Sequence, residues 1–513
     1  MKTPLTPLEP VLRALRVHGQ RPAIVEPGAP ALGYAGLADR VARLMTLLRE
    51  HGLAPGGHAL LVSPNTADAL LAFHAVPLAG GVIVPLNPAF PDESLHFLAA
   101  HADPCVALVD SAHLGRLQGR LDDLGVPVIA IGAGGGLFER LERFPRAPLT
   151  LPAGLDEDGV ISVNYTSGTT SDPKGVMLTH RNAFVNLANL LYHLNLRPGH
   201  AFLHALTLSH SNGWGSAWAV TAAGATHLTL PDPAELRQAI TASGVTHLCA
   251  SPSLLAPLVD SAAPLRLPRP VRLLLAGTRP HSRLLGSLQE QGFEVLHGYG
   301  LTETSAVLSV NDLSETQGAP PQTLTRQGHP MIYSGEIRVV LDSGEAAPHD
   351  GQTPGEIVIR SNQTMKGYYK NPRATRRVMR DGWLHTGDLA VTHPDGRIDI
   401  LDREGDLLNL AGHPFSSTQI EAVLYRHPSV REAVVIGTHA QGGDTPTAFV
   451  TLHPGAQVLG RELLSFCAPH LPDYALPRRI QLVQELPKTA SGKVLKHVLR
   501  EQVREKAVAQ PAD

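Results

Sequence analysis

Cysteine is scarce in this chain of 513 residues, and the positions of its three cysteines exclude a disulfide framework. Cys105, Cys249 and Cys467 lie far apart, without the spacing of a bonded pair or of a metal-ligand motif. We identify no signal peptide, and no run of about 18 uncharged apolar residues that could form a membrane-spanning helix. These absences predict a protein of the reducing cytoplasm without an integral membrane segment.

An excess of charge of either sign is also missing. The net charge of −3 and the isoelectric point near 6.8 give no reason to expect a nucleic acid or an anionic membrane as a partner. Hydrophobic residues make up 43% of the chain and charged residues 17%, which indicates a folded globular protein rather than a disordered one. The length allows a large core with an appended module.

Lysine is the third scarcity, because only 8 of the 43 basic residues are lysine. Generic positive surface charge in this chain is therefore carried by arginine. A lysine that falls inside a motif is accordingly more informative than usual.

The first 400 residues alternate between helical and strand patterns. Leu37, Val41, Leu44 and Leu48 repeat at helical spacing, the apolar run 59–62 reads as a buried strand, and Asn65 is the expected N-cap of the next helix. Further strands are expected at 82–84 and 160–165. This rhythm predicts an α/β fold with a large N-terminal domain of mixed or parallel sheets covered by helices.

The last hundred residues have a different texture. A helix is expected from about Thr418, strands near 433–437 and 448–452, and another helix near Arg461, which suffices for a small mobile α+β domain. We place the boundary so that residues 1–401 form the large domain and 402–513 the small one, with the hinge at Asp402.

A segment rich in hydroxyls follows the strand 160–165. It reads T-S-G-T-T-S-D-P-K-G from Thr166 to Gly175 and supplies the hydroxyls, glycines and single cation, Lys174, that a polyphosphate-binding loop needs. It is not the pattern G-x-x-x-x-G-K-[ST], so it does not indicate a P-loop NTPase. Composition alone would be equally consistent with a flexible turn.

Four further motifs follow in order, H-G-Y-G-L-T-E-T at 297–304, D-G-W-L-H-T-G-D at 381–388, L-D-R-E-G-D at 401–406 and P-K-T-A-S-G-K at 487–493. Each is weak alone, since a Tyr-Gly or Thr-Gly-Asp sequence is usually a turn and a terminal lysine is usually surface charge. Together with Y-T-S-G-T-T-x-x-P-K-G they resemble the signatures of the adenylate-forming superfamily, in the acyl-CoA synthetase branch. The resemblance spans roughly residues 165–493.

The resemblance implies a binding site for ATP and Mg²⁺. In this reading Tyr299 stacks on adenine, Thr302 donates to the α-phosphate, Glu303 holds Mg²⁺, Asp388 binds the ribose hydroxyls, and Arg403 also contacts the ribose. The nucleotide-binding set is completed by Thr166, Ser167, Gly168, Thr169, Thr170, Lys174, His297, Gly298 and Gly300.

The resemblance also implies that Lys493 is the catalytic cation. Lys493 would bridge the substrate carboxylate and the α-phosphate when the small domain closes. For the second step the small domain would turn about Asp402 and present another face, including Gly412, to coenzyme A.

The acid site is expected near the segment L-S-H-S-N-G-W-G at 208–215. His210 and Trp214 there resemble the substrate wall of medium- and long-chain fatty acyl-CoA synthetases, although a core Trp in a glycine-rich turn fits equally well. Gly277 and Thr278 are expected to border the adenine and the acid. Arg279 either binds a polar group of the substrate or points outward, and we favour the second.

Four positions in the small domain depart from the family pattern. They are Gly405 for lysine, Ser417 for proline, Gln419 for glutamate and Lys496 for arginine. We therefore expect an AMP-forming acyl-CoA synthetase acting on a medium- or long-chain fatty acid. The alternatives are an acyl-AMP ligase that loads the phosphopantetheine of a carrier protein, a luciferase-like oxygenase, and an inactive nucleotide-binding scaffold. A homodimer is compatible with the sequence.

Overall fold

Two large sheets make up most of the first 400 residues. The computed structural model describes residues 3–166, 173–242, 244–259, 264–311, 313, 320–410, 413–440, 443–489 and 493–509. The seven-stranded sheet has, from edge to edge, β18 (Gly367–Tyr368), β8 (Lys174–Thr179), β7 (Val160–Thr166), β4 (Val82–Leu86), β3 (His58–Val62), β5 (Pro104–Asp110) and β6 (Val128–Ile131).

The nine-stranded sheet has strands from the middle of the chain at one edge and strands from near the N-terminus at the other. It consists of β15 (His329–Pro330), β14 (Ala306–Val310), β13 (Phe293–Leu301), β12 (Val271–Leu275), β11 (His247–Ala250), β9 (Ala201–Leu203), β10 (Thr226–Leu228), β1 (Pro22–Val25) and β2 (Leu32–Gly33). In both sheets the central strands pair in parallel. Antiparallel pairs lie at the β18–β8–β7 edge of the seven-stranded sheet and at both edges of the nine-stranded sheet. This confirms the predicted fold class.

The two sheets face each other across a shared layer of helices. Strand β3 shows why, since Leu61 belongs to the same buried cluster as Phe202 of the other sheet, whereas Leu60 and Val62 point to the far side. Burial on both faces is expected for parallel strands covered by helices. The shared layer contains α1 (Leu8–Val17), α2 (Tyr34–Glu50), α3 (Ala67–Leu78), α7 (His180–His193) and α9 (Ser216–Ala222).

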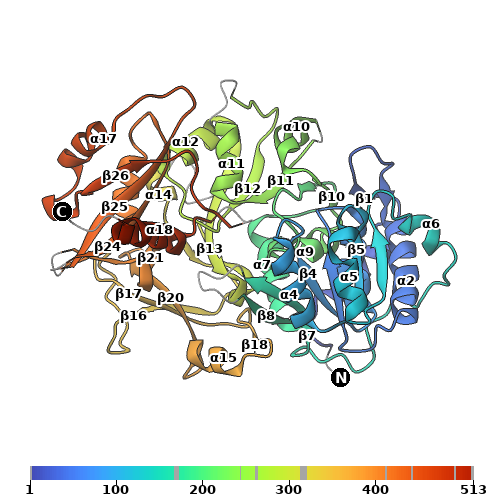
Figure 1. Ribbon diagram of the computed structural model, residues 1–513. Helices are drawn as coiled ribbons and strands as arrows, with labels where there is room; N and C mark the ends of the chain where they lie inside the picture. Colours follow the sequence, from blue (N-terminus) through green and yellow to red (C-terminus); the bar gives the residue numbers. More distant parts are fainter. Residues whose placement is uncertain are drawn as a thin grey trace.

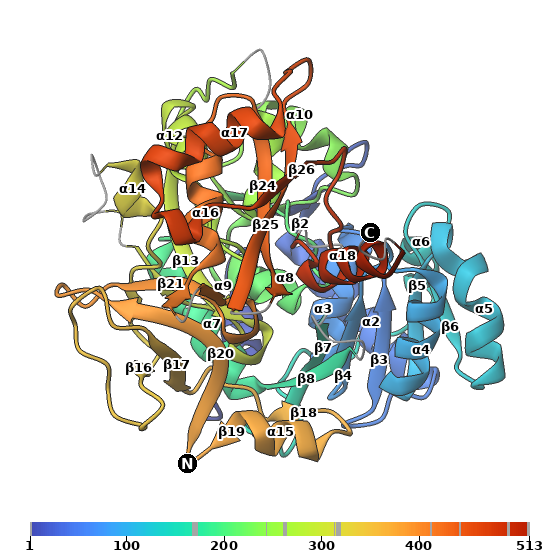
Figure 2. The ribbon, with the colours of Figure 1, turned by 60° about the vertical axis from the view of Figure 1, so that its left-hand side comes forward.

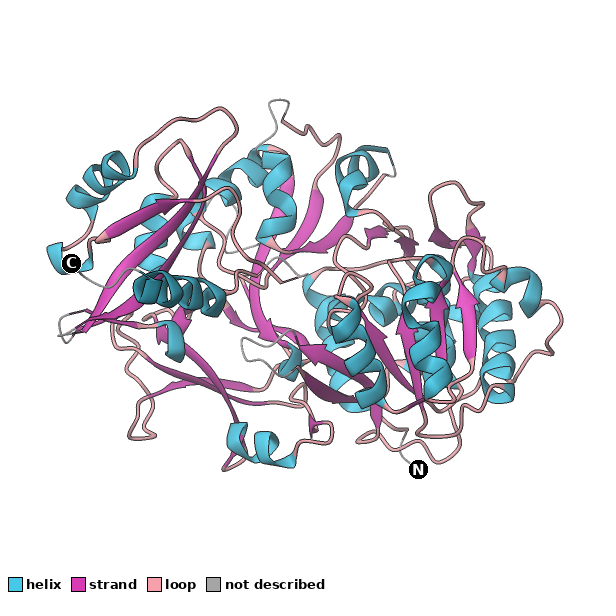
Figure 3. Ribbon diagram, in the orientation of Figure 1, coloured by secondary structure: helices cyan, strands magenta, loops and turns pink. Residues whose placement is uncertain are grey.

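Outer helices complete a layered architecture of helix, sheet, helix, sheet and helix. Those outside the seven-stranded sheet are α4 (Asp92–Ala102) and α5 (Leu114–Asp123), and those outside the nine-stranded sheet are α10 (Leu236–Ala242), α11 (Pro252–Val259) and α12 (Ser282–Glu290). Figure 3 shows the strands of the seven-stranded sheet between helices on both sides.

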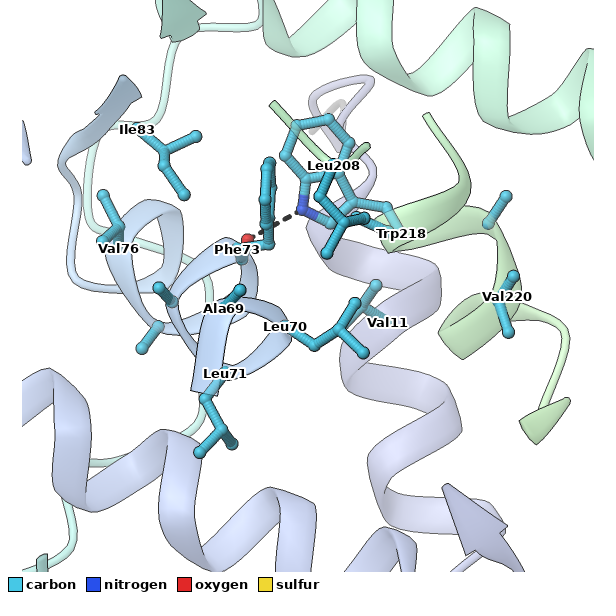
Figure 4. Close-up of a cluster of buried hydrophobic side chains, with 14 of the residues drawn as sticks. Val11, Ala69, Leu70, Leu71, Phe73, Val76, Ile83, Leu208, Trp218 and Val220 are labelled. Atoms are coloured by element: carbon cyan, nitrogen blue, oxygen red, sulfur yellow. Dashed lines mark hydrogen bonds between the residues drawn. The ribbon is translucent and has the colours of Figure 1, made fainter. Parts of the chain in front are cut away.

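Side chains of the central layer interlock where the two sheets are closest. Trp218 of α9 is 1% exposed, and its indole N–H donates to the carbonyl of Phe73 in α3 at 2.9 Å. Leu208, from the segment before α9, lies beside the Trp218 ring (Figure 4). The predicted acid-site segment therefore begins in the core of the large domain.

A third sheet and the C-terminal unit follow. The third sheet holds β16 (Glu336–Val340), β17 (Gly355–Arg360), β20 (Trp383–Thr392), β19 (Met379–Arg380) and β21 (Ile398–Arg403). The C-terminal unit holds β22 (Leu408–Leu410), β23 (His413–Phe415), α16 (Ser417–Leu424), β24 (Val430–Ala440), β25 (Gly443–Leu452), α17 (Gly460–Cys467), β26 (Arg479–Leu482) and α18 (Lys496–Ala509).

The C-terminal unit has its own buried clusters, formed by residues between 408 and 503. It lies at one end of the molecule, with the N-terminus at the opposite side (Figure 1). Figure 2 shows β24 and β25 running together with α16 beside them, in agreement with the predicted α+β texture. The domain boundary itself stays a prediction, because β21 continues without a break through Asp402.

One local prediction was wrong. Asn65 does not cap α3, because the hydroxyl of Thr66 accepts the hydrogen bond from the Ala69 amide at 3.2 Å. The Asn65 amide instead donates to the carbonyls of His204 and Leu206, and its oxygen accepts from the Leu208 amide. A side chain that satisfies three backbone groups on another segment was unavailable for a local cap, and sequence spacing could not reveal that.

Candidate active site

The predicted nucleotide-binding and catalytic residues within the described parts of the chain come from four segments that meet between the large sheets and the C-terminal unit. These are the β7–β8 hairpin, the corner between β13 and β14, the β20–β21 pair, and the segment just before α18. Because each segment is held by strand pairing, the functional side chains are carried by rigid elements.

The corner between β13 and β14 requires its glycines. A Cβ on Gly298 would lie 2.6 Å from the carbonyl oxygen of Ser309, and one on Gly300 would overlap the carbonyl of Ala306. The pairing register shifts between Tyr299 and Gly300, so the strand carries a bulge at the aromatic residue. The short helix η3 (Thr302–Thr304) follows and positions Thr302 and Glu303.

His297 is buried and bonds to backbone carbonyls rather than facing an open site. Its Nδ1 lies 3.1 Å from the carbonyl oxygens of Leu324 and Arg326, and burial lowers the pKa of the ring to about 4. The ring is thus neutral at pH 7 and donates to these carbonyls. It secures the corner that carries Tyr299.

Tyr299, Asp388 and Arg403 form one hydrogen-bonded unit. The Tyr299 hydroxyl donates to Asp388 Oδ2 at 2.6 Å, and Arg403 Nε lies 3.3 Å from Asp388 Oδ1. Asp388 and Arg403 are paired across β20 and β21. Burial and the neighbouring carboxylate raise the pKa of Tyr299 well above its ordinary value. The three residues predicted to hold adenine and ribose are therefore in direct contact.

Hydrogen bonds from β17 and from Thr386 hold the turn that carries Asp388. The Thr386 hydroxyl donates to the Ile357 carbonyl at 2.8 Å and accepts from the Asp388 amide, and Gly387 has a left-handed φ of 69°. The Glu356 carboxylate accepts from the Gly387 amide at 2.9 Å and lies 2.7 Å from His385. This shell holds the Asp388 carboxylate in place.

Lys174 and Glu303 lie on either side of a tyrosine that the sequence did not single out. The Tyr368 hydroxyl donates to Glu303 Oε1 at 2.8 Å, and Lys174 Nζ lies 5.3 Å from the centre of the Tyr368 ring. Tyr368 reaches them because β18 pairs with β8, matching it with Val176. Its local sequence carries no signal, since its role depends on a strand pairing across 190 residues.

Only the two ends of the phosphate loop can be placed. Thr166 and Lys174 are paired as the last and first residues of β7 and β8. The predicted residues Ser167, Gly168, Thr169 and Thr170 lie outside the described residues, as does Gly412 of the small domain.

The residues present fit a magnesium nucleotide. Mg²⁺ in phosphoryl-transfer sites is usually held by one or two carboxylates together with the phosphates. Glu303 offers one such carboxylate close to the cation Lys174, and the described residues contain no cluster of three or more protein ligands that would bind a metal without a phosphate.

Lys493 reaches the nucleotide end of the site from the C-terminal unit. Its amide donates to the Thr489 hydroxyl at 3.1 Å, which fixes the start of the segment before α18. Burial and the charge of Arg403 lower the pKa of Lys493 to about 8, and Asp388 and Asp406 oppose this. The lysine is therefore close to the unit that contains Asp388 and still mostly charged at pH 7.

The predicted acid-site segment borders the corner that holds Thr302. The Ser211 hydroxyl donates to Thr302 Oγ1 at 3.2 Å, and Trp214 is only 4% exposed. His210 is partly buried, which lowers its pKa to about 4. Gly277, with a left-handed φ of 99°, and Thr278 follow β12.

The Arg279 side chain is bonded to β21. Its guanidinium donates to the Ile400 carbonyl at 2.8 Å and lies 3.0 Å from Asp399. It therefore ties the large domain to β21 just before Asp402.

Two of the four departures in the small domain, Ser417 and Lys496, lie beside Asp402. Ser417 donates from its amide and its hydroxyl to Asp402 Oδ2, and Lys496 Nζ donates to the Ser417 hydroxyl at 2.6 Å. Lys496 also lies 3.1 Å from Glu421. A Cβ on Gly405 would meet no atom within 4 Å, so its backbone turn does not exclude a side chain on steric grounds.

Comparisons with known proteins agree with this arrangement. The family described as AMP-binding enzyme matches residues 11–369, and the AMP-binding enzyme C-terminal domain matches residues 419–493. A peroxisomal benzoate–CoA ligase of Arabidopsis thaliana is 33% identical over 97% of this chain and 93% of its own length. An acetate–CoA ligase of Humulus lupulus is 33% identical, covering 98% and 95%.

Solved structures give the same result. The crystal structure of ATP-bound MatB from Rhodopseudomonas palustris superposes with a TM-score of 0.88, at 25% identity, over 98% of this chain and 100% of that one. The similarity covers both domains rather than the nucleotide-binding part alone.

Proposed function

This chain belongs to the AMP-binding enzyme family, and from that premise we propose that its acid substrate is small, either a short aliphatic acid or an aromatic one. The protein is an AMP-forming acid–thiol ligase that uses ATP, Mg²⁺ and coenzyme A. The names of the relatives reported above, benzoate–CoA and acetate–CoA ligase, support a small acid. They give no support to the medium- or long-chain fatty acid expected from the sequence.

The environment of Trp214 also supports a short acid site. Trp214 is part of the central core cluster, and Leu208 of the same segment packs against Trp218 (Figure 4). Because Trp214 is packed in the core, it cannot move aside for a long alkyl chain without disrupting this packing.

In the first step a carboxylate oxygen attacks the α-phosphorus and pyrophosphate leaves. Both reactants are anionic, so the main need is to neutralise their repulsion. Lys493 supplies positive charge beside Asp388, Thr302 offers a hydroxyl to the α-phosphate, and Lys174 lies at the end of the phosphate loop. Bound Mg²⁺ would add charge neutralisation near Glu303. In the second step the thiol sulfur attacks the acyl carbonyl, the thiol proton is lost, and AMP leaves.

The observation that carries this proposal is the contact between the two domains at Asp388. Tyr299 and Arg403 bind its carboxylate, and Lys493 from the C-terminal unit approaches the same group. A nucleotide held by Asp388 would therefore have its α-phosphate within reach of the lysine only when the two domains are closed.

The test is pyrophosphate release from ATP and Mg²⁺ with acetate, butyrate, benzoate, cinnamate, octanoate and palmitate, each with and without coenzyme A. We expect the four small acids to be turned over and coenzyme A to accelerate the reaction. Preference for palmitate would overturn the small-acid proposal. Activation without acceleration by coenzyme A would point to a carrier protein as the acceptor, and oxygen uptake with acyl-adenylate would point to an oxygenase.

A cytoplasmic location and a homodimer remain proposals from the sequence. None of the helices in the described parts of the chain has the length and apolar content that a bilayer crossing requires. Cell fractionation and light scattering would test the two proposals.

A further inference from the structure

A chain of hydrogen bonds between neutral side chains crosses the core of the large domain. Its members are, in order, the Leu70 carbonyl, His74, Thr221, His227, His204 and Ser216. The five side chains are at most 2% exposed. They come from α3, α9, β10 and the residue that follows β9, so the chain joins the nine-stranded sheet to two helices of the shared layer.

The direction of every bond in this chain follows from its first member. A carbonyl oxygen only accepts, so His74 Nδ1–H donates to Leu70 at 2.6 Å. In a neutral ring the other nitrogen is then an acceptor. His74 Nε2 therefore accepts from the Thr221 hydroxyl at 2.9 Å.

The same logic continues to the end of the chain. The Thr221 oxygen accepts from His227 Nε2–H at 2.7 Å, and His227 Nδ1 accepts from His204 Nε2–H at 2.8 Å. His204 Nδ1 then accepts from the Ser216 hydroxyl at 3.4 Å. All three rings are neutral, because burial lowers the pKa of His74 to about 4, that of His204 to about 3 and that of His227 well below its ordinary value.

The chain ends where the backbone is most unusual. The five residues before Ser216 all have left-handed φ, with Ser211 at 48°, Asn212 at 58°, Gly213 at 59°, Trp214 at 56° and Gly215 at 83°. Left-handed backbone is unfavourable for residues that carry a Cβ. Contacts outside this segment must therefore hold it.

Three further contacts hold the same segment. The Asn212 amide donates to the Ser162 hydroxyl at 2.9 Å, and its oxygen accepts from Asn164. The Trp214 carbonyl accepts from the Asn186 amide at 3.0 Å. Because Ser162 and Asn164 belong to β7, the segment is joined to the strand that leads into the phosphate loop.

The segment in turn acts on Thr302. The Ser211 hydroxyl donates to the Thr302 oxygen, so the proton of the Thr302 hydroxyl is directed elsewhere. A threonine that is to donate to a phosphate needs this orientation. Ser211 supplies it only while the segment keeps its left-handed conformation.

We propose that Ser211 is a positioning residue for Thr302, and that the chain from His74 to Ser216 fixes the 211–215 segment, and with it both Thr302 and the Trp214 wall of the acid site. The inference rests on the proposed function, because it takes Thr302 as the phosphate ligand and Trp214 as part of the acid site. It goes beyond that function by assigning a role to three buried histidines.

The first test compares Ser211→Ala with Ser465→Ala. Ser465 is an exposed residue of α17 whose hydroxyl bonds only to the Arg461 carbonyl among the described contacts, so its loss should leave the reaction unchanged. For Ser211→Ala we expect kcat of pyrophosphate release to fall about tenfold with the KM for ATP unchanged, the scale of one lost hydrogen bond. An unchanged kcat, or an equal loss in both variants, would overturn the role of Ser211.

The second test compares His227→Leu with His227→Gln. Leucine removes the chain at its centre, whereas glutamine keeps an amide that can donate toward Thr221. The measured quantity is kcat/KM for the preferred acid divided by kcat/KM for an acid that is two carbons longer. We expect His227→Leu to reduce this ratio about fivefold, again the scale of one lost hydrogen bond. We expect His227→Gln to restore part of the ratio. Equal loss for all acids, with the ratio unchanged, would mean that the histidines only stabilise the fold.

A measurement independent of activity separates this inference from the proposed function. In the full-length protein with 15N-labelled histidine, we expect neutral rings with the proton on Nδ1 for His74 and on Nε2 for His204 and His227. If no acid releases pyrophosphate but these tautomers are found, the proposed function fails and the directed chain stands. Other tautomers would overturn the chain whatever the activity.

Discussion

The side chains of the buried chain from His74 to Ser216 are neutral, whereas the side chains buried around Asp402 include charged groups. His204 and His227 in the large domain meet at 2.8 Å as uncharged rings. Near the hinge, Lys496 lies 3.1 Å from Glu421 and 4.0 Å from Asp402. Buried polar groups are therefore satisfied by neutral hydrogen bonds in the first region and by ion pairs in the second.

The difference matters for motion. A buried neutral chain cannot be opened without leaving donors and acceptors unsatisfied, so it suits a part of the site that stays fixed. Separated charges are stabilised again by water, so an ionic contact suits a surface that opens during turnover. Asp402, the predicted hinge, is a member of this ionic contact.

The largest expected effect is at Lys493, the predicted catalytic cation. Lys493→Ala should lower the rate of adenylation by about 10²–10³-fold, because it removes the charge that the transition state needs. Pyrophosphate release measures this step, and thioester formation from preformed acyl-adenylate measures the other.

The second half-reaction should stay within a few fold of wild type. Lys370→Ala is the control, because Lys370 lies in the large domain and pairs with Asp103 at 3.4 Å on the surface. Equal loss of both half-reactions in Lys493→Ala would show that the lysine only stabilises the closed structure.

Removing the charge of Lys496 tests the difference between the charged network at Asp402 and the neutral chain of the large domain. Burial acts to lower its pKa, but the carboxylates of Glu421 and Asp402 outweigh this and raise it. Lys496→Met would leave these carboxylates unpaired, so we expect it to lower the local free energy of unfolding by about 3–5 kcal/mol. Hydrogen exchange of α16 and α18 measures this.

Two variants make the comparison quantitative. The double variant Lys496→Met with Glu421→Gln should recover part of the loss, since one buried charge is removed. Thr221→Val in the neutral chain should cost less, about 1–3 kcal/mol. If Lys496→Met were milder than Thr221→Val, the charged network would not be the more sensitive one.

Asp388 tests the ribose contact at the meeting point of the two domains. Asp388→Ala removes a carboxylate that binds Tyr299 and Arg403, so we expect the KM for ATP to rise about 10–100-fold, the scale of hydrogen bonds to a charged group. Initial rates of pyrophosphate release at varied ATP measure it. An unchanged KM would argue against the contact.

The pH dependence should separate the regions directly. The pKa of Lys493 is lowered to about 8, first by burial and then by Arg403 and Lys496, against Asp388 and Asp406. Because adenylation needs the charged form, its rate should fall as pH rises through about 8. The buried histidines, with pKa values near 4 or below, should not titrate between pH 6 and 9.

Lys493→Arg provides the matched control for this profile. Arginine stays charged at these pH values, so any residual activity of the variant should lose the fall above pH 8. A fall that persists would assign the titration to another group.

The smallest effect is expected at Arg279. Its guanidinium holds Ile400 and Asp399 rather than the acid site. Arg279→Ala should therefore change the KM for the acid by less than about twofold, within the range of a partly exposed ion pair. A large rise for one class of acids would place Arg279 in the substrate site after all.

Local sequence predicted much of this molecule. The strand at 160–165, the helix around Leu44 and the order of the five motifs could be read directly, because hydrophobic period and glycine-rich turns are local signals. The resemblance implied that Tyr299 and Asp388 bind two parts of the same nucleotide, and the structure joins their side chains by a hydrogen bond.

What could not be predicted depends on distant parts of the chain. Tyr368 reaches Glu303 through a strand pairing, and His74 reaches Thr221 across 147 residues. Asn65 looked like a helix cap but serves the 204–208 segment. In each case the residue type allows several hydrogen-bond partners, and the tertiary structure determines which one is used.

The contacts around β21 also have a consequence for building hybrid enzymes. Arg279 of the large domain binds Asp399 and the Ile400 carbonyl. The next carbonyl, of Leu401, accepts from Ser416 and Thr418, and Asp402 belongs to the network of α16 and α18. The partners of these carbonyls and side chains thus change at a single peptide bond, although Asp402 and Arg403 still pair with β20. A small domain grafted from another parent should be joined between Ile400 and Leu401, since a junction after Arg403 would combine an aspartate of one parent with the serine, glutamate and lysine of the other.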